Sequence, residues 1–437
     1  MSDTLAIEAD WEVLQAGTAE ERACFAAIGI SYGKLWLTQA EDAFVNRVRD
    51  KVHLSGYRLA EWFAWNWWRL RWEPQTRAPD WALAHHMSSI GGGYIWPNIT
   101  IFSDGERVGL LARSTMRRAA EPLRYVADVA AVVRAHVFED AIDRYVAQVV
   151  GQLRAAKVAE TNLDQVWQDV QAERADPLRS SRRKFEALMG FEPDEADEAT
   201  LNGLTADATT LGDSGMTEIA ADRAPGESVM RAAALRELAA TLGYDASPRD
   251  VVRLDAAGRL SATGEVPAWT RGAEAARALR EQERLGDAPI GNSRLARMAG
   301  VDPGVLTERT GGARLSFALD TNATNGRVVL RSKWQTGRRF ELGRLLGDHV
   351  AGARNDRLFP ATRAYTYRQK MQRSFAAELL SPFEAVADML HGDFSEESQI
   401  EVARHFDVSE LTIRTLLVNH RLIDRDVLSM EAEAVAA

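Results

Sequence analysis

Aromatic residues are crowded into one stretch of the chain, and this constrains the fold more than any other feature. Nine of the twelve tryptophans lie in the first 120 residues, seven of them between Trp62 and Trp96. A helix predicted over 59–72, with Ser55 as its cap, would carry aromatic side chains around nearly its whole circumference. Such a helix cannot be surrounded by water, so we expect it in a core or in an interface with a protein partner. The candidate interface residues are Trp62, Trp65, Trp68 and Trp72.

Length and composition set the class of the protein. With 437 residues, 46% hydrophobic and 27% charged, the chain is expected to form two or three folded domains. No apolar run approaches the roughly 18 residues that span a bilayer, and the acidic N-terminus does not resemble a secretory signal. The single cysteine, Cys24, excludes an internal disulfide framework and a cysteine-based zinc site. We therefore expect a cytoplasmic protein with no membrane partner.

Hydrophobic periodicity and turn residues predict an α+β multi-domain fold. Two predicted hairpins and the aromatic helix make residues 1–120 a Trp-rich α+β module. Apolar residues at spacings of three and four predict a helical region over 121–191. Residues 192–222 are acidic and rich in Thr, Ala, Gly and Asp, which is typical of a linker. The remaining residues, 223–437, are predicted to form a mainly helical domain with a short sheet.

Three segments of the C-terminal half occur in an informative order. The first, VVLRSKWQTGRRFELGRLLGDHV (328–350), is a predicted strand and helix, and the second, RSFAAELLSP (373–382), is a helix that ends near a proline. The third, VARHFDVSELTIRTLLVNHRLI (402–423), is a pair of helices. Over residues 265–425 this order resembles the ImmA/IrrE family of bacterial metallopeptidase-like proteins. The resemblance implies a mainly α, zincin-like domain that ends in a helix-turn-helix-like pair at 395–423.

The resemblance also implies where a zinc site would lie, and its residues are replaced in this chain. In the family, the two histidines of HExxH bind zinc, the glutamate activates the metal-bound water, and a glutamate on the next helix is the third ligand. Arg344, Leu345 and Asp348 stand in place of His, Glu and His, and Gln369 stands in place of the third ligand. Arg344 would put a fixed positive charge at the zinc position, and Asp348, one turn later, is placed to pair with it. We therefore expect no metal, no cofactor and no catalytic residue.

Positive charge is concentrated in residues 327–373. This segment holds twelve Lys or Arg residues against three acidic ones, a net charge of +9, whereas the rest of the chain carries -19. Such a segment is typical of a surface for an anionic partner such as nucleic acid, and solvated or internally paired faces are the alternative. The candidate anion-binding residues are Arg331, Lys333, Arg338 and Arg339.

Within the C-terminal helix pair, Ala403, Asp407 and Ile413 have the spacing of a helix-turn-helix. Asp407 replaces the usual turn glycine, and Ser409 is placed to cap the second helix. Arg414 on that helix is the candidate DNA contact. The alternative is that the pair packs on the domain as structure.

These features together predict a catalytically inactive, ImmA/IrrE-like regulatory or assembly protein. The resemblance suggests bacterial stress response, mobile-element control or defence as its setting. We expect a protein partner, with nucleic acid as the alternative, and the oligomeric state is open. Two other functions remain as hypotheses: an active metallopeptidase with unusual ligands, and a helix-turn-helix transcriptional regulator. A metal analysis of the purified protein separates the first of these from the inactive protein.

Overall fold

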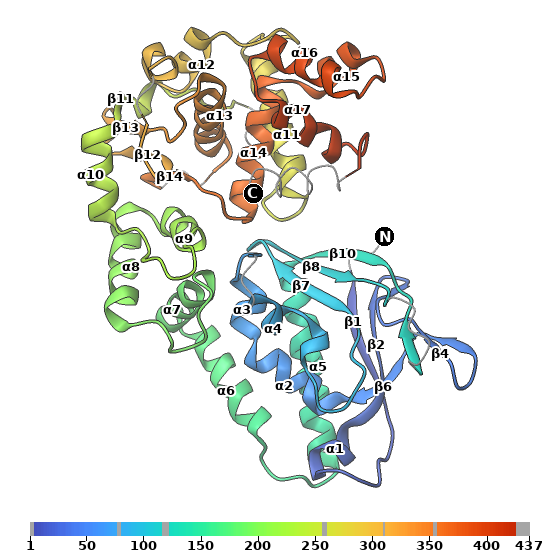
Figure 1. Ribbon diagram of the computed structural model, residues 1–437. Coiled ribbons are helices and arrows are strands. Elements are labelled where there is room, and N and C mark those ends of the chain that lie inside the picture. The colour runs from blue at the N-terminus through green and yellow to red at the C-terminus, as the bar shows by residue number, and fades with distance from the viewer. Residues whose placement is uncertain are drawn as a thin grey trace. The chain divides into compact units, whose positions relative to one another are not determined.

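The chain folds into a mixed α+β structure, described here from a computed structural model (Figure 1). The structure describes residues 4–76, 80–115, 122–255, 260–308, 311–352 and 356–424. It divides into two compact units. Unit 1 comprises Met1–Thr205 and Arg223–Glu227, and unit 2 comprises Ala206–Asp222 and Ser228–Ala437.

The described residues of unit 1 form three small antiparallel sheets. In the first, β2 (Phe25–Tyr32) pairs with β1 (Leu5–Trp11), β3 (Leu35–Trp36) and β6 (Val52–Ser55). The second has the order β10 (Val129–Arg134), β8 (Arg107–Ala112), β7 (Ile99–Ser103). The third has the order β5 (Arg47–Arg49), β4 (Ala40–Asp42), β9 (Leu123–Tyr125). Both predicted hairpins are confirmed, with left-handed glycines, Gly33 and Gly105, in their turns.

The helices of unit 1 pack with these sheets around one core. They are α1 (Ala19–Cys24), α2 (Gly56–Trp65), α3 (Trp67–Trp72), α4 (Trp81–His85), α5 (Ala135–Ala155), α6 (Asn162–Ala175) and α7 (Pro177–Leu188). Ser55 caps α2 by accepting a hydrogen bond from the backbone N–H of Arg58, as expected. The predicted aromatic helix is broken at Asn66, which separates α2 from α3. The apolar face of α5 is buried in the same core as the aromatic residues, so the two predicted N-terminal regions share one core.

Residues 192–222 do not form the linker that their composition suggested. They contain α8 (Glu198–Leu211) and α9 (Asp213–Ala221), separated at Gly212. The physical reason is that alanine favours helices and that buried apolar residues recur along the segment, which gives both helices a face to pack. These buried residues are Leu201, Leu204, Leu211, Met216 and Ile219. The division between the two units falls inside α8.

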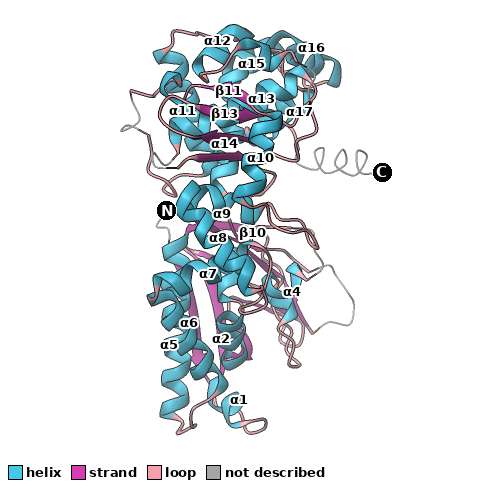
Figure 2. Ribbon diagram, turned by 90° about the vertical axis from the view of Figure 1, so that its left-hand side faces the viewer, coloured by secondary structure: helices cyan, strands magenta, loops and turns pink. Residues whose placement is uncertain are grey.

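Unit 2 is built on one antiparallel sheet, drawn in magenta in Figure 2. Its order is β11 (Tyr244–Ala246), β13 (Gly326–Val329), β12 (Ser316–Asp320), β14 (Leu358–Ala361), so β14 is an edge strand. Its remaining α-helices are α10 (Ala232–Leu242), α11 (Ala268–Gln282), α12 (Asn292–Met298), α13 (Gln335–Ala351), α14 (Tyr367–Leu380), α15 (Phe383–Leu390), α16 (Glu396–Phe406) and α17 (Glu410–Asn419).

Helices α13 and α14 approach each other closely in the core of unit 2. A Cβ atom at Gly347 of α13 would lie 2.5 Å from the Phe375 ring of α14, so this position requires glycine. Helix α11 approaches α14 in the same way, because a Cβ atom at Gly272 would lie 2.4 Å from the carbonyl oxygen of Met371. This close packing fixes which side chains of α13 and α14 face each other.

Candidate functional site

Two of the positions that the sequence analysis aligned with zinc ligands, Arg344 and Gln369, meet between α13 and α14. The Arg344 Nη2 atom donates to Gln369 Oε1 at 2.5 Å and to the carbonyl oxygen of Thr362 at 2.7 Å. Both side chains are buried, and Leu345 is buried in the apolar core. A guanidinium and an amide therefore lie in direct contact at these positions.

The Gln369 side chain also covers the outer edge of β14. Its Nε2 donates to the carbonyl oxygen of Pro360 at 3.0 Å, and its Oε1 accepts from the backbone N–H of Thr362 at 2.8 Å. Gln372, one turn later on α14, donates to the same Pro360 oxygen at 3.0 Å. The carboxamide thus replaces the peptide group of a further strand, because it donates and accepts along the edge as a peptide does. Pro360 has no N–H to offer, which suits an edge strand.

Asp348 does not pair with Arg344 as predicted. It is fully buried and accepts two hydrogen bonds from Arg368 of α14, from Nε at 2.7 Å and from Nη2 at 2.8 Å. Arg368 also donates from Nη1 to Asp356 at 3.0 Å and to Ser214 at 2.5 Å. The prediction failed because it considered only neighbours on the same helix. The residue that forms the bidentate guanidinium–carboxylate pair with Asp348 is Arg368, which lies on α14. Burial opposes the charge of Arg368, but the nearby carboxylates raise its pKa above the usual range.

Arg344, by contrast, has no carboxylate within hydrogen-bond distance among the described residues. Burial, and next the charge of Arg373, lower the pKa of Arg344 to about 9. The two guanidinium groups share an acceptor, since Arg373 Nη2 lies 3.3 Å from the Thr362 carbonyl oxygen that also binds Arg344. With a pKa of about 9 the group remains cationic near neutral pH, so it repels a divalent cation at the same place.

Helix α9 covers the rest of the outer edge of β14, the edge that is not paired with β12. A Cβ atom at Gly215 of α9 would lie 2.6 Å from the carbonyl oxygen of Leu358, and Glu218 accepts from the Thr366 hydroxyl at 2.6 Å. At the end of α9, Asp222 accepts from the backbone N–H of Arg363 at 2.7 Å. Burial raises the pKa of Glu218. The site is therefore a filled polar cluster, closed on one side by α9.

Two of the four predicted anion-binding residues are internal, and the expectation that they lie on a surface was wrong. Arg338 and Arg339 are almost completely buried on α13. Arg338 Nε donates to the carbonyl oxygen of Val305 at 2.6 Å, and Arg339 Nε donates to that of Asp407 at 3.0 Å. A long guanidinium side chain can satisfy carbonyls of distant segments, which charge counting along the sequence does not reveal.

Arg331 and Lys333 remain exposed, as the basic surface requires. Arg331 Nε lies 3.7 Å from the carboxylate of Glu341, a loose ion pair between an exposed arginine and a buried glutamate. Arg354 of the same segment lies outside the described residues.

The C-terminal helix pair has the predicted turn but buries its candidate DNA contact. Asp407 adopts the left-handed conformation with φ 51°, and the Ser409 side chain caps α17. Arg414, however, is only 7% exposed, and its Nε lies 3.4 Å from Gln399 Oε1 of α16. Because α17 is buried on most of its circumference, Arg414 does not face a groove of DNA.

The four candidate interface tryptophans are mostly part of unit 1 itself. Trp62 and Trp68 are buried in the core, and the Trp68 Nε1 donates to Glu173 at 2.7 Å. Trp72 is half-buried under the charges of Arg71 and Lys184. Trp65 alone among the four is well exposed, at 54%. The aromatic helix is thus explained by a core, and the interface assignment is corrected for Trp62 and Trp68.

The α13–α14 cluster is the set of buried polar residues Arg344, Asp348, Arg368, Gln369, Gln372 and Glu218. Several of them were missed by the sequence analysis. Arg368 and Gln372 lie four residues apart on α14, which places both on one face of the helix. This spacing is a sequence signal from which the two residues could have been identified. Glu218 is about 150 residues away along the chain from Arg368, and no sequence pattern connects the two.

Among the described residues, no group of three or more His, Cys, Asp or Glu side chains is arranged to hold a metal ion. Within the same residues, none of the helices combines the length and apolar character needed to cross a membrane. In comparisons with protein-family models, with curated proteins and with solved structures, no significant match to this chain was found.

Proposed function

We propose that this chain is a non-hydrolytic relative of the ImmA/IrrE family, in which a zincin-like domain serves as a regulatory or assembly module. The observation that carries the proposal is the contact of Arg344 with Gln369 at 2.5 Å, where a peptidase of that family would have its metal ligands. A cation held there by protein contacts takes the place of the metal and of the water that it would activate.

The state of β14 supports the same proposal. A peptide that is to be cleaved in extended form commonly adds to an exposed edge strand through main-chain hydrogen bonds. In this chain the edge of β14 is already paired with Gln369 and Gln372, and α9 lies against it. Both requirements of peptide hydrolysis, a metal-bound water and a free edge, are thus replaced by internal contacts.

We propose a protein as the partner, because unit 1 exposes large apolar side chains on one hairpin. Phe44, in the turn between β4 and β5, is 85% exposed, and Val48 on β5 is 60% exposed. Exposed apolar groups of this kind are typical of a protein interface. For the nucleic-acid alternative, Arg331 and Lys333 are exposed and could contact a phosphate, whereas Arg338, Arg339 and Arg414 are internal.

Two assays on the full chain test the proposal. The chain is incubated with an unfolded protein such as casein in the presence of added zinc, with and without a chelator. We expect no metal-dependent cleavage, that is, no cleavage that the chelator would abolish. Cross-linking in the source cells should capture a protein that the Phe44→Ser/Val48→Ser variant loses. The matched control is Val13→Ser, since Val13 is 90% exposed and lies outside this hairpin. Chelator-sensitive cleavage would overturn the non-hydrolytic assignment, and equal capture by both variants would overturn the hairpin as the interface.

A further inference from the structure

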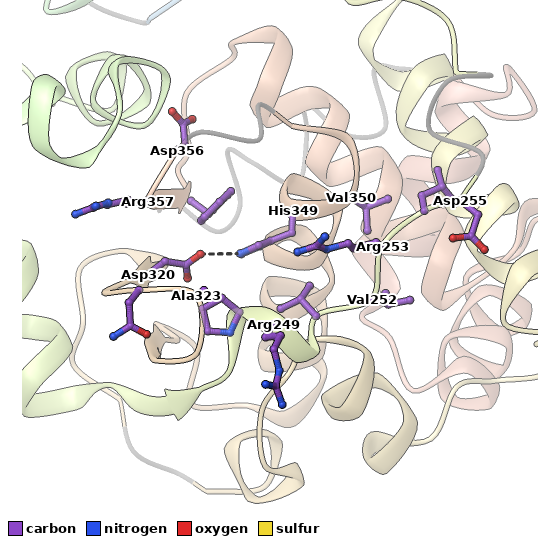
Figure 3. Close-up of a pocket in the computed structure, with 15 residues that line it drawn as sticks. Arg249, Val252, Arg253, Asp255, Asp320, Ala323, His349, Val350, Asp356 and Arg357 are labelled. Atoms are coloured by element: carbon purple, nitrogen blue, oxygen red, sulfur yellow. Dashed lines mark ion pairs between the residues drawn. The ribbon is translucent and has the colours of Figure 1, made fainter.

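Unit 2 contains a cavity that borders the α13–α14 cluster at Asp356 and is not lined by Arg344, Asp348 or Gln369. Its volume is about 700 Å³, and it lies between the loop 248–255, the end of β12 and the last turn of α13 (Figure 3). This is within the range of natural pockets for small organic molecules. Neither Arg344 nor Gln369 lines it, so the cavity can be considered independently of the proposed function.

The cavity wall carries more unpaired positive than unpaired negative charge. Arg253 and Arg357 line it and have no carboxylate partner in the part of the chain that the structure describes. Among the residues that the structure describes, the acidic partner of Arg249 is its neighbour Asp250, in a loose contact at 3.8 Å. Of the three acidic residues among the described residues of the wall, Asp356 is bound by Arg368 at 3.0 Å. This leaves Asp255 and Asp320, and Asp320 has a loose contact with His349 at 3.8 Å. An anion entering this cavity would therefore meet guanidinium groups whose charge is not already neutralised.

His349 forms a rigid part of the wall. Its Nδ1 donates to the carbonyl oxygen of Leu345 at 2.9 Å, and its ring stacks on Phe359 with the ring centroids 3.7 Å apart. The Nε2 atom is therefore the one that points towards Asp320, as Figure 3 shows. Val252 and Val350 add apolar surface to the same cavity. The cavity thus has a charged part and an apolar, aromatic part, which together suit an amphiphilic ligand.

We propose that this cavity binds a small organic anion of nucleotide size. A phosphate or carboxylate group would lie at Arg253, with Arg249 and Arg357 at the rim, because the guanidinium fork matches both anions. The apolar or aromatic part of the ligand would lie against Val252, Val350 and Phe359.

Isothermal titration calorimetry on the full chain tests this with three probes: AMP, citrate and inorganic phosphate. AMP or citrate should bind saturably at one site per chain. AMP binding alone identifies a phosphate ester as the ligand class, and citrate binding alone identifies a carboxylate. Inorganic phosphate should bind more weakly than the better of the two, because it lacks the part that contacts the apolar wall.

Two variants of different kinds keep the test specific. Arg253→Gln should weaken binding about tenfold or more, since a charge-assisted contact is lost. Ala323→Trp should abolish binding by filling the cavity, because Ala323 lines it from an exposed turn and its replacement leaves the core intact. The matched control is Arg404→Gln on the exposed face of α16, which should bind as the wild type does.

The proposal fails if neither AMP nor citrate binds saturably. It also fails if Arg404→Gln weakens binding as much as Arg253→Gln, because the attraction would then come from overall charge. Unchanged binding in a folded Ala323→Trp protein, with circular dichroism like that of the wild type, would place the ligand elsewhere and overturn the site.

Discussion

Replacing Arg339 with alanine should strongly destabilise unit 2, although a basic residue in a basic segment would ordinarily tolerate the change. The Arg339 guanidinium joins α13 to two distant segments. It donates from Nη1 to Asn292 Oδ1 at 2.5 Å, from Nη2 to the carbonyl oxygen of Ile290 at 2.8 Å, and from Nε to that of Asp407 at 3.0 Å. An ion pair with the Asp407 carboxylate, at 3.3 Å, adds to these contacts.

The size of the effect follows from what the substitution leaves behind. The substitution leaves the carbonyl oxygens of Ile290 and Asp407 without their donor, and an unsatisfied buried acceptor typically costs about 1–3 kcal/mol. Two effects make the expected loss of stability smaller than the sum over all the broken contacts. Burial lowers the pKa of Arg339, so the buried charge itself is unfavourable, and Asn292 is exposed enough to bind water instead. We therefore expect a loss of about 3 kcal/mol in the free energy of unfolding.

Urea unfolding followed by circular dichroism measures this loss, with the transition of unit 2 analysed separately from that of unit 1. Arg331→Ala is the matched control, because Arg331 is exposed in the same segment and should change stability by no more than about 0.5 kcal/mol. Equal stability of the two variants would refute the internal role of Arg339. So would a stable Arg339→Ala protein that has lost affinity for nucleic acid.

Three further predictions concern other buried groups. Burial raises the pKa of Glu218, so the stability that its carboxyl contributes is present below the unfolded pKa and is lost as pH rises through the folded pKa. Glu218→Gln should therefore gain more stability over the wild type at about pH 8 than at about pH 5, and an equal gain at both would contradict this reasoning. Gln369→Met leaves the Thr362 N–H without its acceptor and should cost about 2 kcal/mol in urea unfolding, whereas a neutral effect would mean that the edge of β14 needs no partner. Burial raises the pKa of Cys24 to about 12, so its thiol should react with a disulfide reagent only after unit 1 unfolds, and rapid reaction of the native protein would show that the thiol is accessible.

Local patterns predicted much of the secondary structure because local chemistry determines it. The cap at Ser55, the cap at Ser409 and the left-handed turn at Asp407 all depend on residues within a few positions of one another. The burial of Trp62 and Trp68 followed from the aromatic character of their helix, but the sequence did not distinguish a core from an interface.

The contacts that define the α13–α14 cluster are of a different kind. Asp348 pairs with Arg368 across two helices, and outside the cluster Arg339 likewise binds a carbonyl 49 residues away in sequence. Neither partner is determined by helical spacing, so the sequence indicated that charged residues were present without indicating their partners. Residues 192–222 were misassigned for a related reason, because composition was considered without the apolar positions that α8 and α9 bury.

The α13–α14 cluster is closed by protein contacts, and we propose that it does not bind a catalytic metal. Elemental analysis of the full chain, equilibrated with zinc and then dialysed, tests it most directly. We expect far less than one zinc ion per chain, and the same low value for Asp348→Ala and His349→Ala. Stoichiometric zinc in the wild type that is lost in either variant would contradict this proposal and would support a working metallopeptidase with unusual ligands.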